Sequence, residues 1–192
     1  MTKHILTGLF CLLCVTPCYS QHPWRFRSDS YVGLSIGQMG SYGQGQTAGG
    51  LSRGPWFVGL GAGLDYYRYR NVPLFLSVTR DLLTDKRSGL FLILDGGVDL
   101  PWYKTKPYAY QDMSSSFSAG PYWGTGLGYR WRFSEISRKA LLFSATYGMK
   151  KLTEHQTIKG SCYDPPACTL NSDTYTFEYT DRTVRVGVGV EF

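Results

Sequence analysis

The chain has 192 residues, a formal net charge of +6 and a hydrophobic content of 43%. Its length suits a single domain, and its modest positive charge favours contacts with anionic lipid head groups or phosphates over nucleic-acid binding. After the N-terminus, the longest strongly apolar run is 89–94, which ends at Asp95. This run is far shorter than the eighteen or so apolar residues of a transmembrane helix, so any membrane crossing must use strands in a closed barrel.

The N-terminal segment has the three parts of a secretory signal peptide. Basic residues precede an apolar run over 5–15, and Ser20 supplies a small residue for cleavage. We therefore predict a signal peptide over 1–20, cleaved after Ser20, and one mature domain over 21–192. A lipoprotein lipidated at Cys14 or Cys18 is the alternative. The residues before these cysteines, Leu13 and Pro17, disfavour lipidation, because a small residue should stand there.

Two cysteines remain in the predicted mature chain, Cys162 and Cys168. A lone pair of cysteines in an exported chain is most simply a disulfide, and the short spacing predicts that it shapes one loop. The alternative is a metal site, which two thiols without a neighbouring pair of histidines disfavour. We expect no metal and no cofactor.

Alternation between apolar and small or polar residues predicts strands along the chain. The first is 31–38, where Val32, Leu34 and Ile36 occupy alternate positions. In the next clear strand, 56–66, aliphatic residues alternate with glycines and aromatic residues stand at both ends, as at a membrane interface. Five further strands follow the same pattern, at 72–82, 90–102, 121–133, 141–150 and 184–192.

Seven clear strands leave one strand missing, because single-chain bacterial barrels have even numbers. Counting back from a C-terminus in the periplasm, strand 56–66 runs outward and therefore needs an inward-running strand before it. We place that strand in the weakly patterned segment 46–53, before a turn at Gly54–Pro55. Long connections at 103–119 and 151–181 are expected at the external end. The prediction is an all-β fold, an eight-stranded antiparallel up-and-down transmembrane β-barrel with its N-terminus in the periplasm.

Alternation alone is also compatible with a soluble, lipocalin-like barrel. The residues on the two faces of each strand, one row apolar and one rich in glycine, decide between the soluble and the membrane barrel. In a soluble barrel the glycine row would face water, where glycine weakens a strand without compensation. In a narrow membrane barrel, small inward residues make room for larger polar ones. The final strand, 184–192, has valines on one face and glycine or charge on the other, which favours the membrane barrel.

Three segments, 59–67, 124–130 and 185–192, resemble the small outer-membrane β-barrel proteins of Gram-negative bacteria, in the porin-like superfamily. The resemblance implies a location in the bacterial outer membrane. It also implies that Phe192, at the end of an alternating strand, is part of the signal that the barrel-assembly machinery recognises.

The predicted inward rows contain charges of both signs, with Lys150 beside them. They are Asp65, Asp95, Asp99, Arg130, Arg132, Arg185 and Glu191. Such charges must pair or remain hydrated. They indicate either an ion path or a polar plug, and the narrow interior of an eight-stranded barrel favours the plug.

Some small outer-membrane barrels are enzymes that modify lipid A with His and Ser near the outer rim. Here His155, Ser161 and Asp164 share one predicted external connection, but no motif frames them as a catalytic set. We therefore expect no catalytic residues and no enzyme activity.

The predicted external connections carry basic residues interspersed with tyrosines. The basic residues are Arg68, Arg70, Lys104, Lys106, Lys151, Lys159 and Arg182. Such residues suit binding surfaces and the phosphates of lipopolysaccharide, although ordinary solvated loops have the same composition. The favoured function is a structural or surface-binding role, with contacts to outer-membrane lipid, lipopolysaccharide, a ligand or a partner protein. A narrow channel and a lipid-modifying enzyme are the alternatives.

Overall fold

A computed structural model describes residues 23–85, 87–102, 105–107, 113–134, 139–159 and 172–192. The predicted signal peptide and the cysteine pair Cys162 and Cys168 lie outside these ranges. The described residues form ten strands: β1 (Arg25–Gly37), β2 (Gly40–Arg53), β3 (Trp56–Asp65), β4 (Asn71–Thr84), β5 (Ser88–Pro101), β6 (Thr105–Pro107), β7 (Met113–Ser118), β8 (Gly120–Arg132), β9 (Ala140–Lys159) and β10 (Ser172–Glu191). They include no helix long and apolar enough to cross a membrane.

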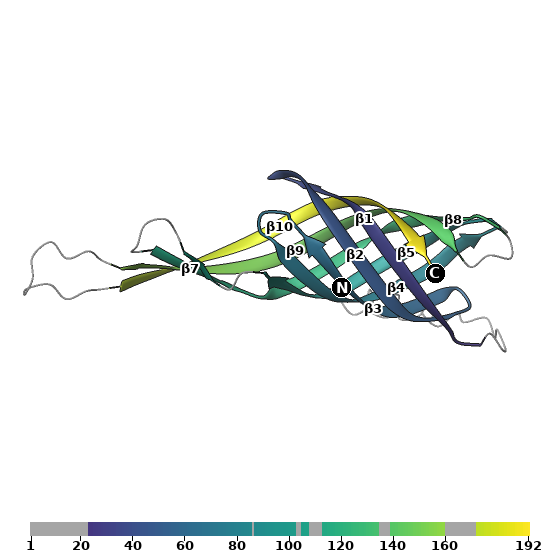
Figure 1. Cartoon of the computed structure of the whole chain (residues 1–192), viewed down its shortest axis with the longest axis horizontal. Helices are drawn as coiled ribbons and strands as arrows, with labels where there is room; N and C mark the ends of the chain where they lie inside the picture. The colour runs from purple at the N-terminus through teal and green to yellow at the C-terminus, as the bar shows by residue number, and fades with distance from the viewer. Residues whose placement is uncertain (1–22, 86, 103–104, 108–112, 135–138, 160–171) are drawn as a thin grey trace, which may run out of the picture.

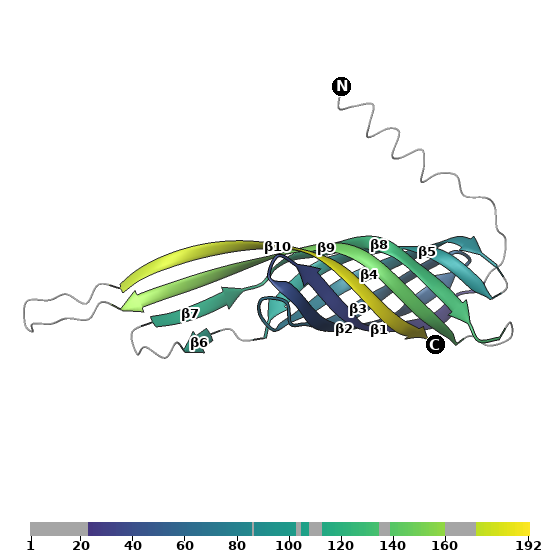
Figure 2. The same ribbon diagram turned by 90° about the horizontal axis from the view of Figure 1, so that it is seen from above.

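Eight of the strands close into a ring (Figures 1 and 2), in the order β10–β1–β2–β3–β4–β5–β8–β9, with β9 paired back to β10. All of the pairings are antiparallel, and β1 meets β10 from Asp29 opposite Glu191 to Gly37 opposite Thr183. The predicted eight-stranded up-and-down barrel is confirmed. We call the end with the Gly54–Pro55 turn and Phe192 the inner end, and the opposite end the outer end.

The weakly patterned strand is present, and it is longer than predicted. It begins at Gly40, and its turn into β3 uses Gly54 in the left-handed region, with φ of 56°, which glycine adopts at little cost. Its outward positions include Gly43, Gly45 and Thr47. Because this face has no apolar row over most of its length, the sequence pattern was faint there.

The rest of the barrel wall is apolar outside and mixed inside. Outward aliphatic side chains are well exposed, for example Leu60 at 73% and Val32 at 70%. Inward positions combine large rings with glycines, and a Cβ added at Gly61 or Gly128 would collide with the ring of Phe75 or Phe91, respectively. Glycine therefore makes space for the rings that fill the narrow lumen.

At the outer end the same sheet continues along β9 and β10 beyond the ring, at the left of Figures 1 and 2. Here β7 pairs with β9 from Met113 opposite Ile158 to Ser118 opposite Thr153, and β6 pairs with β7. We call the segments 105–107, 113–118, 151–159 and 172–181 the outer sheet. Parts of the predicted long connections 103–119 and 151–181 are therefore strands that continue the barrel wall.

The inward glycines give a direct test of lumen packing. We expect Gly128→Ala to lower the free energy of unfolding by about 1–3 kcal/mol, because the new methyl group overpacks the fully buried ring of Phe91. Gly96→Ala is the matched control, since its added methyl group would meet no atom within 4 Å. Urea titration in lipid vesicles, read from the gel mobility of the folded form, measures both. Equal stability of the two variants would contradict the packing account.

Candidate functional site

A cluster of five charged side chains cross-links four strands at the inner end of the lumen. The Nε of Arg27 donates to Asp29 Oδ1 at 2.9 Å and lies 3.1 Å from Glu191 Oε2. Arg130 lies 2.6 Å by its Nε from the same Glu191 oxygen, and its Nη1 donates to both oxygens of Asp81 at 3.0 Å. These buried charges are thus compensated, as a low-dielectric interior requires.

A second cluster closes the outer end of the lumen. The Nζ of Lys150 donates to Asp65 Oδ2 at 2.9 Å and lies 3.8 Å from Asp99 Oδ2. Asn71 Nδ2 donates to that oxygen of Asp99 at 2.9 Å, and all four side chains are buried. Strands β3, β4, β5 and β9 are therefore tied together around one ammonium group.

Between the two clusters lie two further side-chain hydrogen bonds. Arg185 donates to the hydroxyl of Tyr122, and Ser77 Oγ donates to Asp95 Oδ1 at 2.7 Å. A Cβ added at Gly124 or Gly148 would collide with the guanidinium of Arg185. The glycine row is therefore matched to charged side chains as well as to rings.

Each of the four cations in these groups also lies over an aromatic ring, which adds a favourable contact. The pairs are Arg27 over Phe57 at 4.7 Å, Arg130 over Phe91 at 5.1 Å, Arg185 over Tyr122 at 5.1 Å and Lys150 over Tyr67 at 5.7 Å. Rings therefore lie against all four positive charges, and carboxylates pair with three of them, Arg27, Arg130 and Lys150.

Residues of β1, β2, β4 and β5 line a small cavity. This cavity, beside Asp29, Tyr31 and Asp95, has a volume of about 10 Å³. A single water molecule needs about 10–15 Å³ measured in this way, so the cavity has room for one water at most. This arrangement suits a filled lumen and is unsuited to an open ion path.

Six of the seven predicted lumen residues take part in these clusters. The exception is Arg132, which is half-buried at the inner end and makes no ion pair within the described ranges. Sequence reasoning missed Arg27, Asp29 and Asp81. The signal was available, because all three continue the inward rows of their strands at every second residue.

At the outer rim, Arg68 is held in an unusual backbone conformation. Its φ is 64°, the only positive value at a non-glycine residue in the described chain. Its Nε donates to both carboxylate oxygens of Asp181, at 3.0 and 3.2 Å, and its guanidinium lies 4.5 Å from the centre of the Tyr179 ring. Tertiary contacts therefore hold this residue in a conformation that costs backbone strain.

Beside Arg68, the rim is hollowed by a cavity of about 190 Å³. It is lined by Gln38, Tyr67, Arg68, Thr180, Asp181 and Arg182. We call it the rim cavity. The sequence placed the two arginines among the external basic residues, but not together.

The outer sheet continues the lumen-facing side of the barrel as an aromatic face. Glu154 is buried beneath it and accepts hydrogen bonds from the hydroxyls of Ser115, Tyr69 at 3.4 Å and Tyr179 at 3.1 Å. Beyond them, Tyr175 and Phe177 are 49% and 41% exposed. Large exposed rings beside polar groups are typical of binding surfaces.

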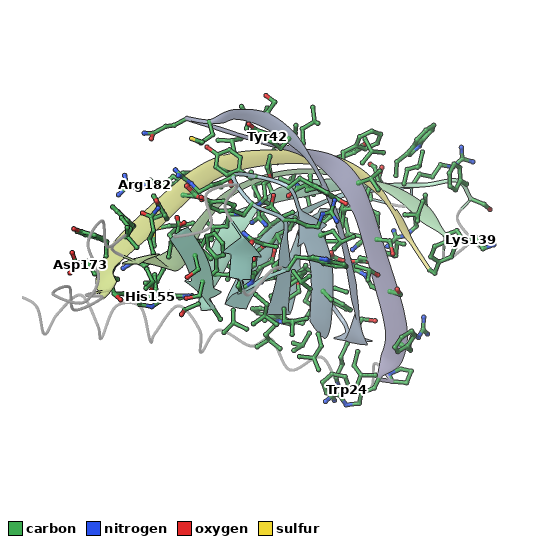
Figure 3. The ribbon with its side chains drawn as sticks, turned by 60° about the vertical axis from the view of Figure 1, so that its left-hand side comes forward. Trp24, Tyr42, Lys139, His155, Asp173 and Arg182 are labelled. Atoms are coloured by element: carbon green, nitrogen blue, oxygen red, sulfur yellow. The ribbon has the colours of Figure 1, made fainter. Side chains whose placement is uncertain are left out.

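The opposite face of the outer sheet is polar, and His155 lies on it. Its Nδ1 is 3.1 Å from Thr176 Oγ1. Figure 3 labels His155 and, on the neighbouring strand β10, Asp173. Ser161 and Asp164 lie outside the described residues, so the hypothetical catalytic set is untested. The described residues hold no group of three metal-ligating side chains arranged around a common point.

Aromatic and basic residues gather at both ends of the barrel wall. At the inner end, Trp24 contacts Arg53, Trp56 contacts Arg80 and Phe192 contacts Lys139; at the outer end, Arg70 contacts Tyr66 and Trp102. Figure 3 shows Trp24 and Lys139 at the end opposite Asp173. Two such belts around an apolar band are typical of a membrane-spanning barrel.

The outer lumen cluster predicts a clear effect of removing its cation. We expect Lys150→Gln to lower the free energy of unfolding by about 3 kcal/mol, because two buried carboxylates lose their compensating charge. Adding Asp65→Asn and Asp99→Asn should restore most of the lost free energy of unfolding. Lys151→Gln is the control, since Lys151 is exposed, and it should change stability by less than about 0.5 kcal/mol. Similar losses in both single variants, measured by urea titration, would contradict this account.

No family model and no curated protein matches this sequence. Two solved structures are similar in fold. Neisserial surface protein A (NspA) has a TM-score of 0.51 and 11% identity, covering 88% of this chain and 98% of that one. The outer membrane protein OprG from Pseudomonas aeruginosa has a TM-score of 0.55 and 14% identity, covering 87% and 95%. With the closed ring of eight strands, these likenesses show that the chain has the fold of the small outer-membrane β-barrel proteins of Gram-negative bacteria.

Proposed function

We propose that this protein is a resident of the bacterial outer membrane whose closed barrel anchors a surface-binding sheet outside the membrane. The partners that we propose are lipopolysaccharide, a soluble ligand or another protein, bound at the outer end. The observation that carries the proposal is the outer sheet, which presents an aromatic face and the rim cavity above a filled lumen.

The outward face of β10 supports this placement. Valines occupy its outward positions from Val190 back to Val184, and Arg182, Thr180 and Glu178 follow in the same row. The segment 184–192 matches the roughly 9–11 residues with which a tilted strand crosses the hydrocarbon core. The polar continuation belongs in water, and at about 3.3 Å per residue the segment 172–181 adds roughly 30 Å of strand.

The lumen supports an anchoring role over the channel alternative. Its cations are paired with carboxylates or a tyrosine hydroxyl and lie over rings, and the cavity beside Asp95 has a volume of only about 10 Å³. A lipid-modifying enzyme is the weaker alternative, because His155 bonds to a threonine and no described carboxylate is placed to orient it. We propose no catalytic residue.

The closed lumen predicts the electrical behaviour of the protein. Purified full-length protein in planar bilayers should conduct little or nothing, because an ion would have to displace buried ion pairs. Asp95→Asn should leave this unchanged, since the bond from Ser77 can be kept by an amide oxygen. A steady, ion-selective conductance that changes in Asp95→Asn would favour the channel instead.

The proposed location predicts how the protein fractionates and assembles. Wild type should be found in the outer membrane and should migrate differently on gels with and without heating. Deletion of Phe192 should reduce the assembled fraction strongly, because its backbone bonds to Ser28 in both directions, at 2.9 and 3.1 Å, and complete the closure of the barrel. Recovery of the wild type as a soluble periplasmic monomer would contradict the membrane assignment.

A further inference from the structure

The rim cavity lies where two paired strands part. The last pair between β1 and β10 is Gly37 with Thr183, and β10 continues outward without β1 through Arg182, Asp181 and Thr180. On this side β10 is an edge strand whose backbone polar groups face the cavity instead of a neighbouring strand. The cavity volume of about 190 Å³ is more than ten times the roughly 10–15 Å³ that one water needs.

Two guanidinium groups line the cavity and only one carboxylate opposes them. Arg68 uses its Nε for Asp181, and within the described chain its two terminal nitrogens have no protein acceptor. Arg182 is exposed and makes no ion pair with any described residue. The cavity therefore has a net positive charge and several N–H donors, which is the chemistry that recognises a phosphate group.

A buried hydroxyl is added to these donors. Tyr67 is 1% exposed and lines the cavity, and its Oη accepts a hydrogen bond from the backbone N–H of Met39 at 2.9 Å. Its hydroxyl hydrogen has no acceptor among the described residues. The ring is fixed by an edge contact with Tyr42 at 5.6 Å, so the donor is held in place before any ligand arrives.

The aromatic face begins at the edge of the same cavity. Tyr179 lies under the Arg68 guanidinium, and Phe177 and Tyr175 follow at alternate positions along β10. These two rings are about half exposed, on the same face of β10 as Asp181. A ligand whose charged end occupies the cavity would therefore extend over exposed rings, and the faces of sugar rings pack well on aromatic side chains. Figure 3 shows Arg182 at the rim between Tyr42 and the outer sheet.

From this arrangement we propose that the rim cavity binds a phosphorylated saccharide. The phosphate contacts Arg68, Arg182 and the Tyr67 hydroxyl, and the sugar rings lie along Phe177 and Tyr175. The inference rests on the proposed function, because it requires the outer end to face the cell exterior. The ligand is either a lipid-borne phosphosugar, as in lipopolysaccharide, or a soluble sugar phosphate, and both share the same chemistry.

The test uses calorimetric titration of the full-length protein, folded in uncharged detergent micelles, with three probes: inorganic phosphate, glucose 1-phosphate and glucose. We expect glucose 1-phosphate to bind more tightly than either of the others. Arg182→Gln should weaken binding of both phosphate probes by roughly tenfold, because a charge-assisted hydrogen bond is lost. Phe177→Ala should weaken binding of glucose 1-phosphate and leave that of inorganic phosphate unchanged.

Two further variants separate specific binding from general charge and from misfolding. Lys151→Gln removes an exposed positive charge on the strand beside Thr180 without touching the cavity, and it should bind as wild type does. Arg68→Gly relieves the positive φ while removing the second guanidinium, and it should bind both phosphate probes more weakly although the barrel remains folded. Heat-dependent gel mobility checks the fold of every variant.

Unchanged binding in both Arg182→Gln and Arg68→Gly, or equal loss in Lys151→Gln, would overturn the site. Equal affinity for inorganic phosphate and glucose 1-phosphate would overturn the saccharide assignment. Competition by lipopolysaccharide, but not by phosphatase-treated lipopolysaccharide, would identify a lipid-borne source, and its absence a soluble one. Because fractionation and conductance do not depend on this cavity, failure of the site would leave the proposed function standing.

Discussion

The pairing of β1 with β10 is the constraint on which the rest of the molecule depends. In hydrocarbon, an unpaired backbone group costs several kcal/mol, so a sheet can cross a membrane only when it has no free edge. Ser28 and Phe192 supply the last backbone bonds of this seam. Eight strands then fix a narrow circumference, and the interior must hold every inward side chain. The glycines opposite Phe75, Phe91 and Arg185 follow from that limit.

Much of the barrel could be predicted, because every second residue of a strand lies on the same face, and this alternation can be read directly from the sequence. Alternation placed Asp65, Arg130 and Arg185 inside the lumen. It did not predict their partners, because these depend on how strands far apart in sequence are staggered around the ring. Arg130, for example, meets Asp81 from β4 and Glu191 from β10. Only the closed fold brings three such strands to one point.

The sequence pattern failed where the outward face of a strand has no apolar row. In β2 the outward face consists largely of glycine and threonine, so no apolar row marks it. Beyond Met149 and Val184, lysine, arginine, threonine, histidine and glutamate occupy the outward positions. In β10 the apolar residues pass to the inward face, so the outward apolar row that marks a membrane strand ends although the strands continue. The rim cavity could not be predicted either, for a different reason. Its lining joins the turn beside Gln38 to residues far along the chain, and the sequence does not show that these segments meet.

The continuity of β9 and β10 has a consequence for recognition. A binding loop on a flexible tether loses conformational freedom when it closes on a ligand, and this loss weakens its affinity. Here the residues beneath the aromatic face belong to strands that continue into the barrel wall, and they are already ordered by ladder hydrogen bonds. The proposed binding surface is thus preorganised, and its orientation relative to the barrel is set by the same two strands. A ligand bound there would be held at a fixed height and angle above the barrel.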